Sequence, residues 1–336
     1  MQQGVIETFE AGDVVLQSGL TLPDAKVVFQ TFGELSASAD NAIVYPTRFG
    51  GTHLDNAYLI GDGMALDPER YFIVVPNLIG NGESSSPSNA QPAIRGGRFP
   101  LVTIYDNVRL QHRLIVGELG VRGIALAVGW SMGGQQAYQW AALYPDLVRR
   151  LAVICGAART APHTHVFLEG VRAALTCDPA WDVPGVVAER GSRALGRVWA
   201  GWALSQTFYR EHRYRDLGYS SVEDFLSRYW EAIYLSRDPG NLVAMMRTWQ
   251  ACDLSANAEF ESDYERAMRS ITADAVIMPG RTDLYFPPED SEFEVELLRS
   301  AQLAVIPSIW GHYAGGGRNA PDTAFVDGQL RDLLAR

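Results

Sequence analysis

Short runs of β-branched and apolar residues alternate with helical patterns along this chain of 336 residues. The runs stand at 26–32, 42–45, 71–75, 124–128, 151–155, 275–278 and 303–306. The later runs are almost wholly apolar, which is typical of parallel strands that helices cover on both faces. Helical patterns at 105–119 and 133–143 flank the fourth run. The alternation therefore predicts an α/β fold with a mostly parallel central sheet.

The alternation stops after Cys155. Between 158 and 271 no run has the pattern of a strand, and Trp, Tyr, Arg and Leu recur at helical spacings, for example over 222–233. We interpret this segment as a helical lid domain, 158–271, inserted before the last two strands. The core domain is then made of residues 1–157 and 272–336.

The sharpest local signal is the sequence Gly-Trp-Ser-Met-Gly-Gly at 129–134, between the strand 124–128 and the helix 133–143. A Gly-x-Ser-x-Gly motif in this context is a nucleophile elbow. The tight turn needs small neighbours, and it holds the hydroxyl of Ser131 above the sheet at a helix N-terminus, where developing negative charge is favoured. The alternative is a glycine-rich turn whose serine only caps the helix.

A nucleophilic serine needs a base and an acid that orients the base. Asp283 follows the strand 275–278, and His312 follows the strand 303–306. The carboxyl ends of the strands are where the functional groups of an open α/β sheet collect. The order Ser, Asp, His is that of the α/β-hydrolase fold, so we predict a triad of Ser131, Asp283 and His312. A capping aspartate and a structural loop histidine are the alternatives.

An oxyanion hole needs two backbone N–H groups. We expect one from Met132, directly after the nucleophile. The other should come from the loop 46–51, where we favour Arg48 over Thr47. No metal or organic cofactor is needed for this chemistry. His163 and His165 could bind a metal, but a third ligand in a compelling pattern is missing, and a solvated lid loop is the better interpretation.

The formal net charge is -11, which argues against nucleic acid and anionic membranes as partners. Three cysteines do not resemble a disulfide framework or a zinc site, and fit a reducing compartment. The N-terminal stretch 1–7 lacks the features of a signal peptide, and no apolar run is long enough for a membrane span. These observations predict a soluble, cytoplasmic protein.

The chain resembles the homoserine O-acetyltransferases and their related esterases over most of its length. The similarity includes LDPERYFIV at 66–74, DNVR at 106–109, SMGGQQA at 131–137 and DLYFPPE at 283–289. The resemblance implies that the lid narrows the active site to a tunnel. It also implies a homodimer that forms through lid helices.

Two departures concern the substrate. The resemblance implies that the homoserine enzymes carry an aspartate directly after the catalytic histidine, and that this aspartate holds the substrate ammonium. It also implies a lid arginine that holds the substrate carboxylate. Here Tyr313 and Trp202 occupy those positions. A buried charge needs a partner, so we expect the esterase branch, with an apolar alcohol group in contact with Trp130, Trp202 and Tyr313.

The sequence therefore predicts a carboxylic-ester hydrolase that acts on short acyl esters, acetate esters first, through an acyl-enzyme on Ser131. The alternative is an O-acetyltransferase that moves acetyl from acetyl-CoA to homoserine or another alcohol. The same triad serves both, so it cannot separate them. A third alternative, an inactive fold used for binding, is disfavoured by the complete set of Ser, Asp and His.

Overall fold

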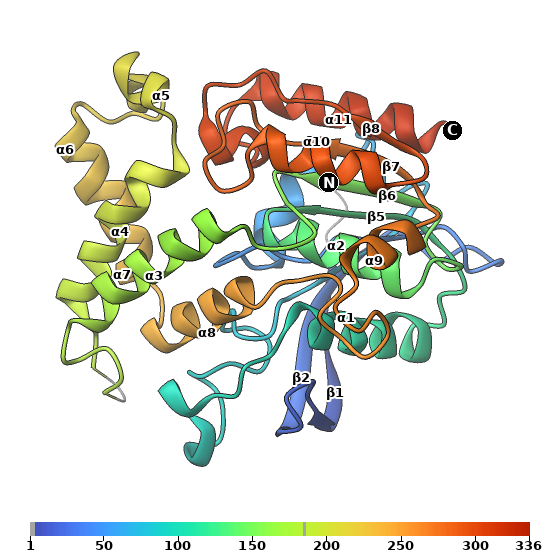
Figure 1. The fold of residues 1–336 in the computed structure, drawn as a ribbon, viewed down its shortest axis with the longest axis horizontal. Coiled ribbons are helices and arrows are strands. Elements are labelled where there is room, and N and C mark those ends of the chain that lie inside the picture. Colours follow the sequence, from blue (N-terminus) through green and yellow to red (C-terminus); the bar gives the residue numbers. More distant parts are fainter. Residues whose placement is uncertain (1–3, 184–185) are drawn as a thin grey trace.

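One eight-stranded sheet runs through the computed structural model, in the order β1-β2-β4-β3-β5-β6-β7-β8 (Figure 1). The structure describes residues 4–183 and 186–336. Of the N-terminal stretch 1–7, which the sequence analysis compared with a signal peptide, the first three residues lie outside the described ranges. The strands are β1 (Val5–Val15), β2 (Thr21–Phe32), β3 (Ala42–Val44), β4 (Phe72–Pro76), β5 (Ile124–Trp130), β6 (Arg150–Ile154), β7 (Asp274–Met278) and β8 (Ala301–Leu303). β2 pairs antiparallel with β1 and β4, and the remaining pairs are parallel.

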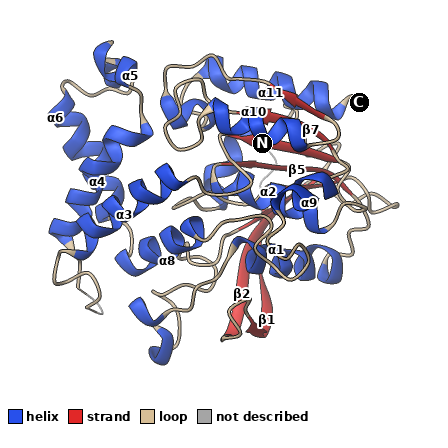
Figure 2. Cartoon of the chain, viewed as in Figure 1, coloured by secondary structure: helices blue, strands red, loops and turns tan. Residues whose placement is uncertain are grey.

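Helices lie on both faces of this sheet (Figure 2). They are α1 (Ile104–His112), α2 (Met132–Leu143), α3 (Pro162–Thr176), α4 (Glu189–Ala203), α5 (Gln206–Arg210), α6 (Val222–Phe225), α7 (Ala232–Leu235), α8 (Pro239–Gln250), α9 (Tyr264–Ser270), α10 (Pro288–Leu297) and α11 (Ala320–Leu334). Every helix in the described ranges is too short or too polar to pass through a lipid bilayer.

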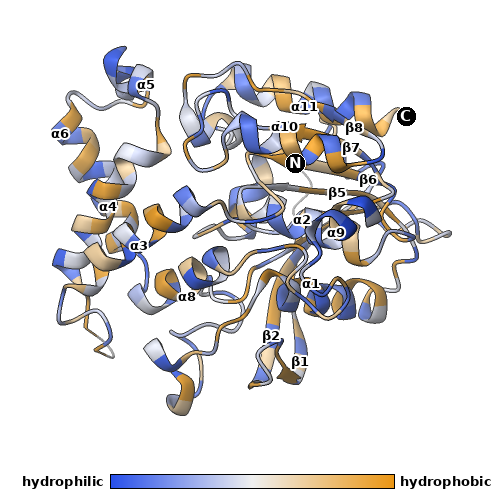
Figure 3. Cartoon of the chain, viewed as in Figure 1, coloured by the Kyte–Doolittle hydropathy of each residue, from blue (hydrophilic) through white to orange (hydrophobic). Residues whose placement is uncertain are grey.

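The inner strands consist largely of apolar residues (Figure 3). Successive residues of a strand point to opposite sides of the sheet, so both faces of these strands are apolar. Val153 and Ile277 belong to the core that includes α1, α2, α9 and α10. Ala152 and Val276 belong to the core under α11 and the segment 59–66. This double coverage explains why β5, β6 and β7 could be predicted as continuous apolar runs.

Three elements differ from the prediction. β1 was not expected, because most residues of 5–15 are exposed and the segment carries no apolar run. The strand forms through its pairing with β2. The helix expected at 105–119 is α-helical only to His112 and continues as a π-helix over Arg113–Glu118. The strand expected at 303–306 is assigned to Ala301–Leu303, although Ile306 still donates a backbone hydrogen bond to Pro279 at 2.9 Å.

The segment between β6 and β7 contains α3 to α9, with no named strand in its described residues. Helices α3 to α8 gather beside the carboxyl ends of β5 to β7, whereas α9 lies against α2 (Figure 1). Their apolar side chains, such as Phe167 and Trp199, join the same hydrophobic core as Val153 of the sheet. Because the lid helices and the sheet share this hydrophobic core, the division of the chain into a core domain and a lid domain stays a prediction.

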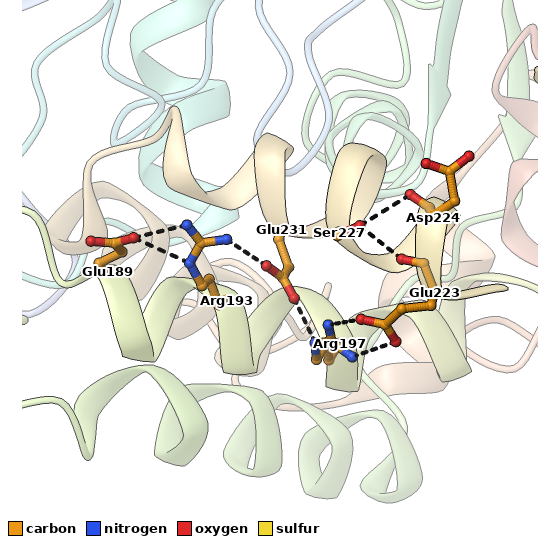
Figure 4. A network of polar contacts seen from close by, with 7 residues as sticks. All are labelled: Glu189, Arg193, Arg197, Glu223, Asp224, Ser227 and Glu231. Carbon is orange, nitrogen blue, oxygen red and sulfur yellow. Dashed lines mark hydrogen bonds and ion pairs between the residues drawn. The ribbon is translucent and has the colours of Figure 1, made fainter. Parts of the chain in front are cut away.

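An ion-pair network joins α4 to the π-helix Leu226–Glu231 in the lid (Figure 4). The buried carboxylate of Glu231 contacts Arg193 at 2.6 Å and Arg197 at 2.5 Å. Burial raises the pKa of Glu231, but the two guanidinium groups outweigh it and hold the pKa below its usual value. Arg193 and Arg197 also contact Glu189 and Glu223, so the charge of Glu231 is matched on both sides.

Candidate active site

Ser131 connects β5 to α2 in a strained backbone conformation, with φ 60° and ψ -126°. Such a conformation is costly for a residue with a side chain and recurs at functional sites. The neighbouring glycines have a steric reason. A Cβ on Gly129 would lie 2.0 Å from the carbonyl carbon of Gly133, and a Cβ on Gly133 would lie 2.6 Å from the oxygen of Pro46. The turn therefore has the backbone geometry of the predicted elbow, and the role of Ser131 as the nucleophile stays a prediction.

His312 and Asp283 form a buried pair. The Nδ1 atom of His312 lies 2.7 Å from Oδ2 of Asp283. The other carboxylate oxygen of Asp283 accepts the backbone N–H of Tyr285 at 2.8 Å, which fixes the plane of the carboxylate. The ring of Trp130 stacks on the ring of His312 with 5.2 Å between centroids. The imidazole is thus held on one edge and on one face.

The two oxyanion alternatives differ in their hydrogen bonds. The N–H of Thr47 donates to Pro76 at 3.2 Å, so it is already used. The Thr47 hydroxyl accepts from Leu78 at 2.9 Å, and Thr47 does not line the cavity beside Ser131. Among the described residues, the N–H groups of Arg48 and Met132 have no hydrogen-bond partner. This difference favours Arg48 and Met132 as donors to a bound oxyanion.

Ser131 and His312 line one cavity of about 130 Å³, under the lid helices. This is small beside the roughly 300–1,000 Å³ of sites for drug-sized ligands, so only a few substrate atoms fit near the serine. The cavity is lined by Arg48, Phe49, Asp55, Trp130, Ser131, Trp199, Trp230, Ile233, Tyr234, Arg237, Trp249, Tyr285, His312, Tyr313 and Arg318.

The three residues expected to contact substrate are not all in this lining. Trp130 and Tyr313 are, and the Tyr313 hydroxyl accepts a hydrogen bond from Tyr229 at 3.2 Å. Trp202 is not, because its ring packs toward α3, 5.0 Å from Phe167 between centroids. Trp199, on the same helix α4, lines the cavity instead.

The structure also brings residues to the site that the sequence analysis missed. Three arginines, Arg48, Arg237 and Arg318, line the cavity, whereas the sequence analysis expected only aromatic side chains around an apolar alcohol group. Neither Arg237 nor Arg318 stands in a recognised motif. Only Arg48 was placed at the site by the sequence analysis, from its position in the loop after β3, and there it was predicted to act through its backbone N–H group and not through its guanidinium.

Cys155, directly after β6, is the other missed neighbour. Its sulfur and ligand atoms of Asp283 and His312 all lie within 4.8 Å of one another. Burial, together with the nearby charge of Asp283, raises the pKa of the Cys155 thiol well above its usual value. Within 4–183 and 186–336, His163 and His165 belong to no such group. His163 packs on Trp202, with 4.9 Å between ring centroids.

Comparison with known proteins agrees with this fold. A family model described as the alpha/beta hydrolase fold matches residues 49–317. An ethyl acetate hydrolase of Pseudomonas veronii is 35% identical over 99% of this chain and 96% of its own length. A homoserine O-acetyltransferase of Symbiobacterium thermophilum is 32% identical, covering 90% of this chain and 87% of its own. The solved structure of the acetyl esterase MekB superposes with a TM-score of 0.96 at 34% identity, over 99% of this chain and 97% of that one.

The chain therefore belongs to the α/β-hydrolase fold family. Within that family it belongs to the branch of esterases that are related to the homoserine O-acetyltransferases.

Proposed function

We propose that this protein is a carboxylic-ester hydrolase for short acyl esters, acetate esters first. The observation that carries the proposal is that Ser131, on its strained elbow, lines the same small cavity as the His312–Asp283 pair. The names of the relatives support it, since an ethyl acetate hydrolase and an acetyl esterase match almost the whole chain.

In the proposed mechanism, the free ring nitrogen of His312 takes the proton of the Ser131 hydroxyl as the oxygen attacks the ester carbonyl. Asp283 holds the imidazole through Nδ1 and stabilises the imidazolium that forms. The N–H groups of Met132 and Arg48 stabilise the oxyanion. His312 then protonates the leaving alcohol. Water, deprotonated by His312, attacks the acyl-enzyme and releases the carboxylic acid.

The first experiment is hydrolysis of p-nitrophenyl acetate by the wild-type chain and by Ser131→Ala. We expect the variant to lose on the order of 10⁴-fold or more in kcat. Ser291→Ala is the matched control, because Ser291 is also buried but lies on α10 outside the cavity. A Ser131→Ala protein that keeps a tenth of the wild-type rate would rule out Ser131 as the nucleophile.

A second candidate is the O-acetyltransferase, which the similarity to homoserine O-acetyltransferases favours. Adding acetyl-CoA and homoserine to the same assay separates the two. Release of p-nitrophenol without any acceptor indicates a hydrolase, and release of free CoA that depends on homoserine indicates the transferase. We also propose a homodimer through the lid, which sedimentation analysis of the purified chain tests.

A further inference from the structure

The cavity carries a positive charge that contrasts with the rest of the chain. The chain has 39 acidic and 28 basic residues, Lys and Arg together. The described lining of the cavity nevertheless holds three arginines, Arg48, Arg237 and Arg318, and one carboxylate, that of Asp55. A cluster of like charges in a partly closed cavity is unfavourable unless an opposite charge joins it, so this lining needs an explanation.

Asp55 matches only one of the arginines. Its Oδ1 atom lies 3.1 Å from Nη2 of Arg48, and its Oδ2 atom accepts the backbone N–H of Thr52 at 2.8 Å. A second nitrogen of Arg48, Nη1, donates to the carbonyl of Phe49 at 2.9 Å. The third, Nε, is buried and has no partner among the described residues. A guanidinium has five N–H groups, so the contacts with Asp55 and Phe49 leave Arg48, which lines the cavity, with three N–H groups that have no partner among the described residues.

Arg237 forms no ion pair within the described chain, and the carboxylate of Asp55 acts on its charge only from a distance. No carboxylate lies within 4.0 Å of its guanidinium, and no side-chain hydrogen bond forms there. The group lies against Gly50, where a Cβ would stand 1.7 Å from Nη1. Burial, followed by the repulsion of Arg48, lowers the pKa of the Arg237 guanidinium. A guanidinium that has no ion-pair partner beside a small cavity is an arrangement that an anionic ligand stabilises.

We propose that the ester substrate carries a carboxylate remote from the scissile bond, and that Arg237, with N–H groups of Arg48 that have no other partner, binds this carboxylate. The inference rests on the proposed hydrolase activity and names its substrate class. Arg318 lies at the exposed rim, with its guanidinium 5.9 Å and 5.7 Å from the ring centroids of Tyr229 and Tyr313, where it attracts an anion toward the entrance. The aromatic lining then contacts the uncharged part of the substrate.

The carboxylate could belong to the acyl half or to the alcohol half of the ester, and two substrate pairs distinguish these sources. Methyl hydrogen succinate and its neutral amide, methyl succinamate, test the acyl half. 3-Acetoxypropanoate and 3-acetoxypropanamide test the alcohol half. For wild-type protein we expect kcat/KM for the acid to exceed that for the amide about tenfold or more in one pair. If the amides are hydrolysed as well as both acids, the inference is wrong.

The Arg237→Met variant keeps most of the side-chain length and removes the charge. We expect it to lower the acid-to-amide ratio of kcat/KM about 10- to 100-fold. Arg210→Met is the matched control, because Arg210 is exposed on α5 outside the cavity, and it should leave this ratio unchanged. An unchanged ratio in Arg237→Met would assign the preference to another group.

A measurement on wild-type protein does not depend on how the variant folds. Succinate should inhibit hydrolysis of p-nitrophenyl acetate competitively, at least tenfold more tightly than succinamide. Equal inhibition by the two compounds would overturn the inference. Failure of the inference is distinct from failure of the proposed function. If the protein hydrolyses the esters but does not prefer the acids to the amides, only the carboxylate site is contradicted. If it hydrolyses no ester, the proposed hydrolase activity itself is contradicted.

Discussion

The carboxylate of Glu294 accepts a 2.6 Å hydrogen bond from the backbone N–H of Ala158, where the chain leaves β6 for the lid. It also accepts from the hydroxyl of Tyr138, on α2, at 2.9 Å and from that of Tyr264, on α9, at 3.2 Å. Glu294 therefore connects the helix after the nucleophile with both ends of the lid segment. Its side chain is buried, and burial raises its pKa to about 7.

This raised pKa makes the stability of the protein depend on pH. The folded chain holds the Glu294 proton more tightly than the unfolded chain, in which the pKa is about 4.3. Folding therefore binds a proton between about pH 4.3 and 7, and the contribution of this group to the free energy of unfolding falls as pH rises through that window, by about 4 kcal/mol at most. Glu294→Gln removes this dependence.

The measurement is the free energy of unfolding at pH 5 and pH 8, for the wild-type chain and two variants. The loss between the two pH values should be smaller in Glu294→Gln than in the wild type. Glu292→Gln, on the exposed side of α10, should behave as the wild type does. Equal losses in all three proteins would show that Glu294 is ionised in both the folded and the unfolded state at pH 5.

Substitution by alanine should have opposite effects on stability at Gly129, which is crowded by backbone atoms, and at Gly170, which has open space around it. Gly129→Ala places a Cβ 2.0 Å from the carbonyl carbon of Gly133, and neither backbone can yield without moving the elbow. We expect a loss of about 3 kcal/mol or more in the free energy of unfolding. Gly170→Ala, in the exposed face of α3 with open space around it, should gain about 0.5–1 kcal/mol. Denaturant titrations check both, and a mild effect at Gly129 would mean that the elbow is looser than described.

Asp283→Asn tests the orientation of the histidine. The asparagine oxygen can still accept the N–H of Tyr285, so the loop should keep its conformation, but the amide NH₂ then faces Nδ1 of His312. This favours the tautomer that cannot accept the serine proton, and we expect kcat to fall about 10³- to 10⁴-fold. Asp332→Asn, exposed on α11, is the control. A loss of only a few-fold would mean that His312 does not depend on Asp283.

Homoserine should be a poor acceptor. The described cavity lining offers its ammonium a single carboxylate, that of Asp55, which Arg48 and the N–H of Thr52 already use. A missing charged partner costs roughly 1.5–3 kcal/mol, or about 10- to 100-fold in kcat/KM. The comparison is kcat/KM for homoserine acetylation against hydrolysis of ethyl acetate. A preference for homoserine would place the chain with the transferases.

Much of the fold, and the places that Ser131, Asp283 and His312 take in it, could be predicted because they depend on local patterns. Buried parallel strands must be apolar on both faces, so β5, β6 and β7 are visible as runs. The elbow needs glycine on either side of Ser131 for steric reasons that act within a few residues. Chain order and strand ends were enough to select Asp283 and His312.

β1 and the polar lining of the cavity could not be predicted in the same way. β1 exists because β2 offers it hydrogen bonds, not because its own residues are apolar. Which side chain of the lid reaches the cavity depends on how α4 rotates against α3, and this rotation put Trp199 rather than Trp202 in the lining.

The sequence by itself determined the parallel part of the sheet, the strained turn at Ser131 and the strand ends that carry Asp283 and His312, because backbone sterics and strand burial leave a local trace. Only the tertiary structure decided that Arg237, after α7, meets Arg48, after β3, beside Ser131. The two arginines are 189 positions apart in the chain. Charged residues that approach one another only through tertiary packing have no characteristic spacing in the sequence. The positive charge of the cavity could therefore be recognised only from the position of the lid in the tertiary structure.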